Sequence, residues 1–439
     1  MNPAPTEHHV YDLIGIGIGP FNLGLACLSE PLDDVEALFL DENDGFAWHH
    51  GVMFDDATIQ VPFMADMVTM ADPASPYSFL NWLKQTGRLY SFYIREDFHP
   101  LRREYDAYCR WVAGQLPNLR WQHRVESVEY VEAEDLFLVT SLSAQGVEKH
   151  LARNVVTGIG TGPRIPEVFS GLESGARHSS RYLYEREEIV TAESIAVVGS
   201  GQSAAEIYLD LLSDQRNHGY QLDWITRSPR FFPMEDTKLT LELTSPEYVR
   251  HFHSLPESRR DRLGREQRGL YKGISMTTID DVYEALYRES FERDLPTTLL
   301  TNTAVIGAEP SADGDEIVLS LHHEELGTTT QRGAQQVIMA TGYAPRDPEF
   351  LRPVEHLIRR DEAGRFDVDL EFHVDTLGGR LFVQNAEEHT HGLTAPDLGM
   401  GPWRNAIILK NILGREVYPI EHDIAFQTFG LTAATEEIK

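Results

Sequence analysis

Two glycine-rich segments of the sequence have the spacing of turns that bind the phosphates of a dinucleotide. In the first, Gly15, Gly17 and Gly19 alternate with isoleucines and are followed by Pro20. Gly15 allows a tight turn, and Gly17 lets the backbone approach a pyrophosphate at the N-terminus of the next helix. Pro20 replaces the third glycine, so the pattern is imperfect and an ordinary tight turn is the alternative.

The residues around this first turn favour a strand–turn–helix unit. Residues 11–14 predict a short buried strand before the turn, and residues 23–28 predict a helix after it. A second strand, residues 36–40, ends at Asp41, 26 residues after the first glycine. A carboxylate at this distance can bind a ribose hydroxyl, and Glu42 is the neighbouring alternative.

The second turn has the same setting. It follows a buried strand at residues 194–198 and precedes a helix at residues 205–212, with alanine in the third glycine position. The next strand, residues 223–226, ends in Arg227 rather than in an acid. An arginine there suits the 2′-phosphate of NADPH, although a surface arginine is the alternative. The residues expected at the pyrophosphate are Gly199, Gly201, Gln202 and Ser203.

Two such turns imply two dinucleotides, with FAD in the first site and NADPH in the second. Strands alternate with helices, which predicts an α/β fold of two Rossmann-like dinucleotide-binding domains, the NADPH domain inserted in the FAD domain. We expect the first part of the FAD domain, with substrate-contacting segments, over residues 1–170. The NADPH domain should cover 190–300, the second FAD and substrate part 301–425, and a polar tail 426–439.

Composition excludes several classes of partner. The net charge of −31 would repel nucleic acid and anionic membranes, and gives either a well-solvated surface or a field that attracts a cationic substrate. The sequence has neither an 18-residue apolar run nor a secretory signal pattern. Two cysteines, Cys27 and Cys109, fit a reducing cytoplasm, and no histidine pair has partners at metal-ligand spacing, so we expect no metal.

Taken together, the motifs resemble the microbial N-hydroxylating flavin monooxygenases of siderophore biosynthesis, which include ornithine, lysine and diamine hydroxylases. The resemblance runs from residue 11 to about residue 416. It rests on residues 15–22, 46–49, 60–63, 72–73, 75–80, 102–105, 198–204, 340–343 and 391–393.

This resemblance implies a reaction. NADPH reduces FAD, the reduced flavin takes up dioxygen to form a C4a-hydroperoxide, and a neutral amine attacks the distal oxygen to give a hydroxylamine. Bound NADP⁺ and a dry pocket protect the peroxide, and the protein mainly supplies orientation.

It also implies residue roles. Gln60, Arg103 and Lys272 are the candidate catalytic residues. Trp48, His49 and Gln60 match positions that line the flavin, although core packing is the alternative for Trp48. The other implied cofactor residues are Gly15, Gly17, Gly19, Pro20, Asp41, Gly199, Gly201, Gln202, Ser203, Arg227, Ala340, Thr341 and Gly342.

The substrate positions depart from the amino-acid hydroxylases. Those enzymes carry a lysine for the substrate carboxylate five residues after the flavin-side glutamine, and this chain has Ala65 there. Leu241 falls where the ornithine enzymes have asparagine. An apolar pocket without this anchor favours a linear diamine, putrescine or cadaverine. Its distal ammonium needs a partner, for which Glu242 is a candidate and a solvent-facing glutamate is the alternative.

Other activities remain open at this point. L-Lysine N6- or L-ornithine N5-hydroxylation is the first alternative, and a non-catalytic flavin-binding protein is another. A flavin disulfide reductase would need paired cysteines, and a Baeyer–Villiger type oxygenase would oxidise ketones. Relatives suggest a homo-oligomer, a dimer or a tetramer.

Overall fold

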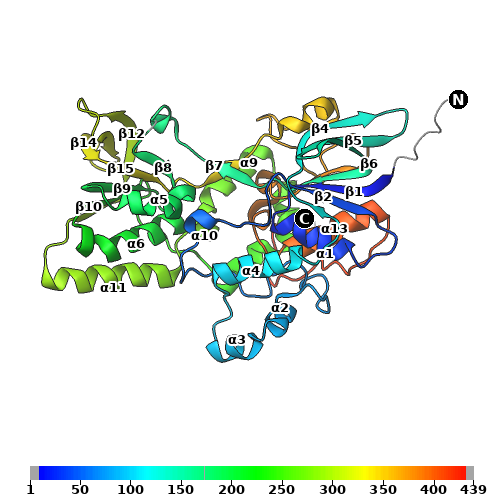
Figure 1. The fold of residues 1–439 in the computed structure, drawn as a ribbon, viewed down its shortest axis with the longest axis horizontal. Coiled ribbons are helices and arrows are strands. Elements are labelled where there is room, and N and C mark those ends of the chain that lie inside the picture. Colours follow the sequence, from blue (N-terminus) through cyan, green and yellow to red (C-terminus); the bar gives the residue numbers. More distant parts are fainter. Residues whose placement is uncertain (1–8, 173, 432–439) are drawn as a thin grey trace, which may run out of the picture.

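The computed structural model describes residues 9–172 and 174–431, which form two lobes side by side (Figure 1). Within these residues no helix is long and apolar enough to cross a membrane. The expected tail, residues 426–439, lies largely outside the described part of the chain.

The first lobe is built on a mixed sheet with the strand order β3-β2-β1-β6-β5-β4, and β17 pairs with the end of β6. The strands β3, β2, β1, β6 and β17 run parallel, whereas β4, β5 and β6 form an antiparallel meander. Their bounds are β1 Val10–Ile16, β2 Ala37–Leu40, β3 Leu119–Arg120, β4 Arg124–Val131, β5 Leu136–Ser143, β6 Gly146–Thr157 and β17 Leu381–Val383.

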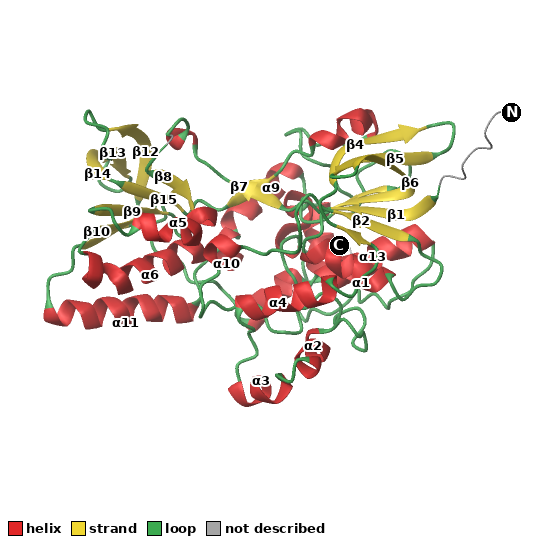
Figure 2. Ribbon diagram, in the orientation of Figure 1, coloured by secondary structure: helices red, strands yellow, loops and turns green. Residues whose placement is uncertain are grey.

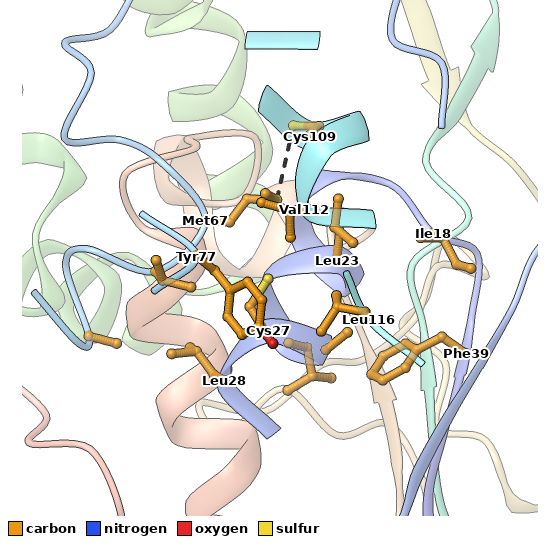
Figure 3. Packing of buried hydrophobic residues seen from close by; sticks show 14 of the residues in the cluster. Ile18, Leu23, Cys27, Leu28, Phe39, Met67, Tyr77, Cys109, Val112 and Leu116 are labelled. Carbon is orange, nitrogen blue, oxygen red and sulfur yellow. Dashed lines mark hydrogen bonds between the residues drawn. The ribbon is translucent and has the colours of Figure 1, made fainter. Parts of the chain in front are cut away.

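Alternate residues of this sheet face two different cores, as the two-residue repeat of a strand requires. Leu13 and Phe39 pack on one face against α1 (Pro20–Ser29), α4 (Arg102–Ala113) and α13 (Gly401–Leu413). Figure 3 shows this packing, in which Cys27 and Cys109 lie among apolar side chains and Cys109 contacts Met67. On the opposite face, the side chains of β1 and β2 pack against those of β4 and β5, the antiparallel strands of the same sheet, and against η5 (Glu349–Leu357).

The second lobe contains an all-parallel sheet with the order β11-β10-β9-β15-β8. Ile195 and Val197 of β9 face α6 (Gln202–His218) and α11 (Met276–Glu292). Ala196 faces the three-stranded antiparallel sheet β12-β13-β14, so the layers are helix, sheet and sheet (Figure 2). The bounds are β8 Ala176–His178, β9 Ser194–Val198, β10 Gln221–Ile225, β11 Thr297–Leu300, β12 Thr303–Pro310, β13 Ile317–His323, β14 Thr328–Ala334 and β15 Gln336–Met339.

The sheet pairings confirm the two Rossmann-like units but move the expected domain boundaries. β15 hydrogen-bonds to β9, so the chain returns to the first lobe only after Met339 and not at residue 301. β8 already belongs to the second sheet, ahead of the expected start at residue 190. Two connections between the lobes lie side by side as the antiparallel ribbon of β7 (Thr161–Pro163) and β16 (Tyr343–Pro345).

Short helices fill the space around and between the lobes. They are η1 His50–Val52, α2 Phe79–Gln85, α3 Leu89–Arg95, η2 Glu167–Phe169, η3 Ser179–Arg181, α5 Tyr182–Ile189, α7 Lys238–Leu241, η4 Glu242–Thr244, α8 Pro246–Ser254, α9 Glu257–Glu266, α10 Arg268–Tyr271, α12 Glu388–His391 and η6 Gly392–Thr394.

Candidate active site

The first glycine-rich turn is shaped by close backbone and ring contacts. A Cβ on Gly15 would lie 2.2 Å from the Phe39 ring, and one on Gly17 would lie 2.6 Å from the Gly158 oxygen. Gly17 also has a φ of 87°, which favours glycine. On Gly19 a Cβ would meet nothing closer than 3.9 Å, so this side of the turn is open.

Helix α1 begins at Pro20, three residues before the expected start. Proline suits the first helical position because that residue needs no N–H donor. No side chain caps the helix at Gly19, which leaves its first N–H groups available to an anion. Proline in place of the third glycine of the pattern is therefore compatible with phosphate binding.

Two buried amides that the sequence motifs did not reveal support this turn. The Asn22 Nδ2 donates to the carbonyls of Gly17, at 2.8 Å, and Ile16, at 3.2 Å. Its Oδ1 accepts from Gln384 at 2.7 Å, which ties the turn to the loop after β17. Asn22 is visible in the sequence beside the glycines, but Gln384 carries no local signal.

Asp41 lies directly after β2, as expected, and its carboxylate is turned toward the glycine turn. Oδ2 accepts from the Ile18 N–H at 2.6 Å, and Oδ1 accepts from the Asn43 N–H at 2.8 Å. Each carboxylate oxygen can accept more than one hydrogen bond, so Asp41 can still take a ribose hydroxyl. Glu42, the alternative, is exposed.

The second turn repeats this construction. A Cβ on Gly199 would lie 2.2 Å from the Ala340 backbone oxygen, which explains why residue 199 is glycine. The Trp224 Nε1 donates to the Gly199 carbonyl at 2.8 Å and holds the turn in place. α6 begins at Gln202, earlier than residue 205, and no side chain caps it at Gly201.

Ser203 lies in the first turn of α6, and Arg227 precedes Ser228, whose hydroxyl donates to that of Ser200 in the second turn at 3.1 Å. Arg227 is exposed two residues beyond β10, and no ion pair to it is found among the described residues. Ser203 is partly buried at the second position of α6. Both placements leave the side chains free for a phosphate.

A hydrogen-bond chain joins residues of the first lobe to the helix that follows the second turn. The Gln60 Nε2 lies 3.4 Å from the Gln202 Oε1, and the Gln202 Nε2 donates to Glu206 at 2.8 Å. The Arg102 guanidinium pairs with Glu206 at 2.8 Å and donates to the Val52 carbonyl at 2.8 Å. Gln60 therefore lies at the junction, next to the residue that opens α6.

Arg103, the expected catalytic arginine, does not share this position. It points to solvent and pairs with Asp55 at 3.1 Å, with 53% of its side chain exposed. Arg102, its neighbour, is the arginine that reaches the lobe junction. The geometry gives no support to a catalytic role for Arg103.

Trp48 and His49 lie just before η1 in the chain. The centroids of the Trp48 and His49 rings are 5.2 Å apart. The His49 ring also lies 5.7 Å from the ring of Tyr343, the first residue of β16. His49 has a φ of 54°. Although its ring keeps contact with solvent, desolvation by surrounding atoms lowers the pKa of His49, and the charges of Arg102 and His50 lower it further. The ring is therefore neutral near pH 7.

The remaining predicted cofactor residues, Ala340, Thr341 and Gly342, form the turn after β15. The Thr341 hydroxyl donates to the Arg164 carbonyl at 2.5 Å, and the Gly342 carbonyl lies 3.0 Å from the His178 ring nitrogen. Gly342 has a φ of 78° and open space around it. This turn lies where the chain leaves β15 for the connection between the lobes.

The predicted substrate residues Ala65 and Leu241 and the predicted catalytic residue Lys272 lie in different surroundings. Ala65 is buried five residues after Gln60, whereas Leu241 is half exposed on α7. Lys272 pairs with Glu388 at 3.2 Å, and its carbonyl lies close to the second turn at Gly201.

Glu242 is not in a substrate pocket. Its carboxylate accepts the backbone N–H groups of Phe426, at 3.0 Å, and Gln427, at 2.9 Å, and so holds the C-terminal segment. These bonds, the first above all, lower the pKa of Glu242. The expectation that it binds a substrate ammonium is not supported, because both carboxylate oxygens already bind the chain.

A buried charge cluster that the sequence did not predict lies behind the first turn. Arg404 and Glu387 are fully buried and pair at 3.1 Å. Arg404 also donates to the Thr394 and Ala395 carbonyls and stacks over the Phe21 ring at 4.6 Å. The pair links α13 to the start of α1.

Comparison with known proteins assigns a family to this arrangement. Residues 9–345 match the family described as L-lysine 6-monooxygenase/L-ornithine 5-monooxygenase. The chain belongs to this family.

Several members of the family are similar over nearly their whole length. The putrescine N-hydroxylase of Acinetobacter baumannii is 44% identical over 433 residues, 99% of this chain and 96% of the relative. The rhizobactin siderophore biosynthesis protein RhbE of Rhizobium meliloti is 41% identical over 436 residues, 97% and 96% of the two chains. The crystal structure of DfoA bound to FAD, a cadaverine monooxygenase of Erwinia amylovora, has a TM-score of 0.95 at 48% identity and covers 97% of this chain and 100% of that one.

We predict that Gly15→Ala disrupts the first turn. The added Cβ would press on the Phe39 ring at 2.2 Å, and such overpacking costs about 1–3 kcal/mol. Differential scanning calorimetry should show a lower Tm and the purified protein less bound FAD. Gly264→Ala, at a site with nothing within 4 Å, is the control. Adding Phe39→Leu should restore part of the loss; no restoration would contradict the steric explanation.

We also predict opposite outcomes for two adjacent arginines. Arg102→Met leaves Glu206 buried without its partner and should cost about 3–5 kcal/mol of stability. Arg103→Met removes an exposed pair, worth about 0–1 kcal/mol. Thermal unfolding of both variants checks this, and equal shifts in Tm would show that the Arg102 pair does not stabilise the junction.

Proposed function

We propose that this chain is an FAD- and NADPH-dependent monooxygenase that hydroxylates one primary amine of a linear diamine, putrescine or cadaverine, in hydroxamate siderophore biosynthesis. The observation that carries the substrate assignment is Ala65, buried at the position where the amino-acid hydroxylases have a carboxylate-binding lysine. The similarity to a putrescine N-hydroxylase, a cadaverine monooxygenase and a rhizobactin biosynthesis protein supports it.

The two turns fit the two cofactors. FAD belongs on the uncapped helix α1, beside Asp41, and NADPH on the uncapped helix α6, beside Arg227. Together, bound FAD and NADPH would supply the two electrons with which dioxygen is activated, one oxygen atom going to the amine and the other to water. The protein holds the two nucleotides in register through the Gln60, Gln202 and Glu206 chain.

The chain's own residues must orient the amine and keep water out. A free alkylamine has a pKa of about 10.4, so the reacting nitrogen has to lose a proton before it can act as a nucleophile. We propose that Gln60 positions the cofactors at the lobe junction. A contribution of Lys272 would act through its backbone beside the second turn, because its ammonium pairs with Glu388.

We further propose that the protein acts in the cytoplasm as a homo-oligomer, a dimer or a tetramer. Two buried free thiols, Cys27 and Cys109, fit a reducing compartment. Three large apolar side chains on the outer surface of α3, those of Tyr90, Tyr93 and Ile94, are exposed and favour association.

The first test of this function is a substrate panel. The purified holoprotein should consume NADPH and oxygen and form a hydroxylamine with putrescine or cadaverine, at a kcat/KM well above that for L-lysine or L-ornithine. Without a cation at residue 65, the carboxylate of an amino acid would enter the pocket unpaired. Efficient hydroxylation of L-lysine or L-ornithine without diamine turnover would refute the substrate assignment.

The second test concerns the cofactor. Arg227→Ala should raise the KM for NADPH about 10- to 100-fold, the expected loss of a charge-assisted contact to a phosphate, and leave the KM for NADH nearly unchanged. Steady-state kinetics with both nucleotides checks this. Arg352→Ala, at an exposed arginine of η5, is the matched control. An equal change with both nucleotides would show that Arg227 does not contact the 2′-phosphate.

A further inference from the structure

A linear diamine carries a second ammonium, and a buried ammonium needs an anionic partner. Glu242, the candidate from sequence, is only partly exposed and is bound to the C-terminal segment. The partner must therefore come from elsewhere around Ala65. A role for such a partner rests on the proposed diamine activity.

Asp397 lies beside Ala65, although 332 residues separate them in the chain. It belongs to the loop between η6 and α13. A Cβ built on Gly399 would be 3.1 Å from Asp397 Oδ1 and 3.6 Å from the Cβ of Ala65. The carboxylate thus faces the same small space as the residue that replaces the lysine of the amino-acid hydroxylases.

This loop also borders the first nucleotide turn. Leu398 and Gly401, on either side of Gly399, line a small hollow together with Pro20 and Tyr105. η6, which precedes the loop, packs against η4 next to Leu241. The loop that carries Asp397 therefore lies close to Pro20, which is predicted to contact FAD, and follows a helix that packs beside the predicted substrate residue Leu241.

The charges around Asp397 leave room for one more cation. Arg404 is its nearest compensating charge, but Arg404 is already paired with Glu387 at 3.1 Å. Asp397 Oδ1 accepts the backbone N–H of Met400 at 3.1 Å, and no salt bridge to Asp397 is found in residues 9–172 and 174–431. Asp397 thus has a backbone N–H partner but no ion-pair partner of its own among the described residues.

We propose that Asp397 binds the distal ammonium of the diamine and selects diamines over amino acids. In this arrangement Ala65 leaves the space that the substrate chain occupies, and Asp397 supplies the negative charge. A lysine in the pocket binds the carboxylate of an amino acid, at the end of the substrate remote from the reacting nitrogen. A carboxylate in the pocket binds an ammonium at that end instead. Desolvation raises the pKa of Asp397, and a bound ammonium would offset this by favouring the ionised carboxylate.

The test compares substrates with and without the second ammonium. For wild type and Asp397→Asn holoprotein, kcat/KM and the calorimetric Kd are measured with putrescine, cadaverine and butylamine. The variant should lower the ratio of putrescine to butylamine by about 30-fold or more, as expected when one partner of a buried charge pair is removed. Asp280→Asn, at an exposed aspartate of α11, should leave this ratio unchanged.

The outcomes separate this inference from the proposed function. If wild type hydroxylates diamines and Asp397→Asn keeps the wild-type ratio, or loses putrescine and butylamine alike, Asp397 does not bind the ammonium. If wild type hydroxylates no diamine, the proposed function fails, and the role of Asp397 fails with it.

Asp397→Glu provides an independent measurement if the asparagine variant does not fold. The added methylene would move the carboxylate toward the reacting end. The preference should then shift roughly tenfold toward putrescine, the shorter diamine, since one methylene is worth about 1–3 kcal/mol in a pocket. An unchanged ratio of putrescine to cadaverine would overturn the assignment.

Discussion

The buried ion pair between Arg102 and Glu206 is the contact that joins the first lobe to the helix after the second glycine-rich turn. Arg102 belongs to α4 of the first lobe, and Glu206 belongs to α6, four residues after Gln202. The same carboxylate accepts a hydrogen bond from Gln202, which lies against Gln60. A desolvated pair of this kind adds little net stability, but either partner alone would be costly, so the two lobes are held in one arrangement.

Close backbone packing at both turns adds a second constraint. At each turn a glycine lies where a Cβ would collide: Gly15 meets the Phe39 ring and Gly199 meets the Ala340 carbonyl. These contacts bring the ends of neighbouring strands together, and the two helices that follow present uncapped N-termini. The phosphate sites therefore depend on strand packing as much as on the turn sequence.

In the proposed site, selection of the substrate depends on the charges around residue 65 as well as on the shape of the pocket. The buried Arg404 and Glu387 pair fixes α13 against the start of α1, and Asp397 lies just before that helix. In the proposed substrate site, a neutral, small residue at position 65 near this carboxylate would give the pocket the opposite charge from a lysine-bearing one. The strongly negative chain as a whole, at −31, would also attract a dication.

The sequence by itself determined the fold class and the two glycine-rich turns, because each of these signals lies within a few residues along the chain. The roles of Asp41, Arg227 and Ala65 stay predictions. Tertiary structure decided what local patterns leave open. Adjacent helical residues point about 100° apart, so only packing showed that Arg102 and not Arg103 turns inward. A buried strand does not reveal which sheet it joins, so β15 was assigned to the wrong lobe. The neighbours of Ala65 come from the far end of the chain, and no spacing in the sequence could have linked it to Asp397.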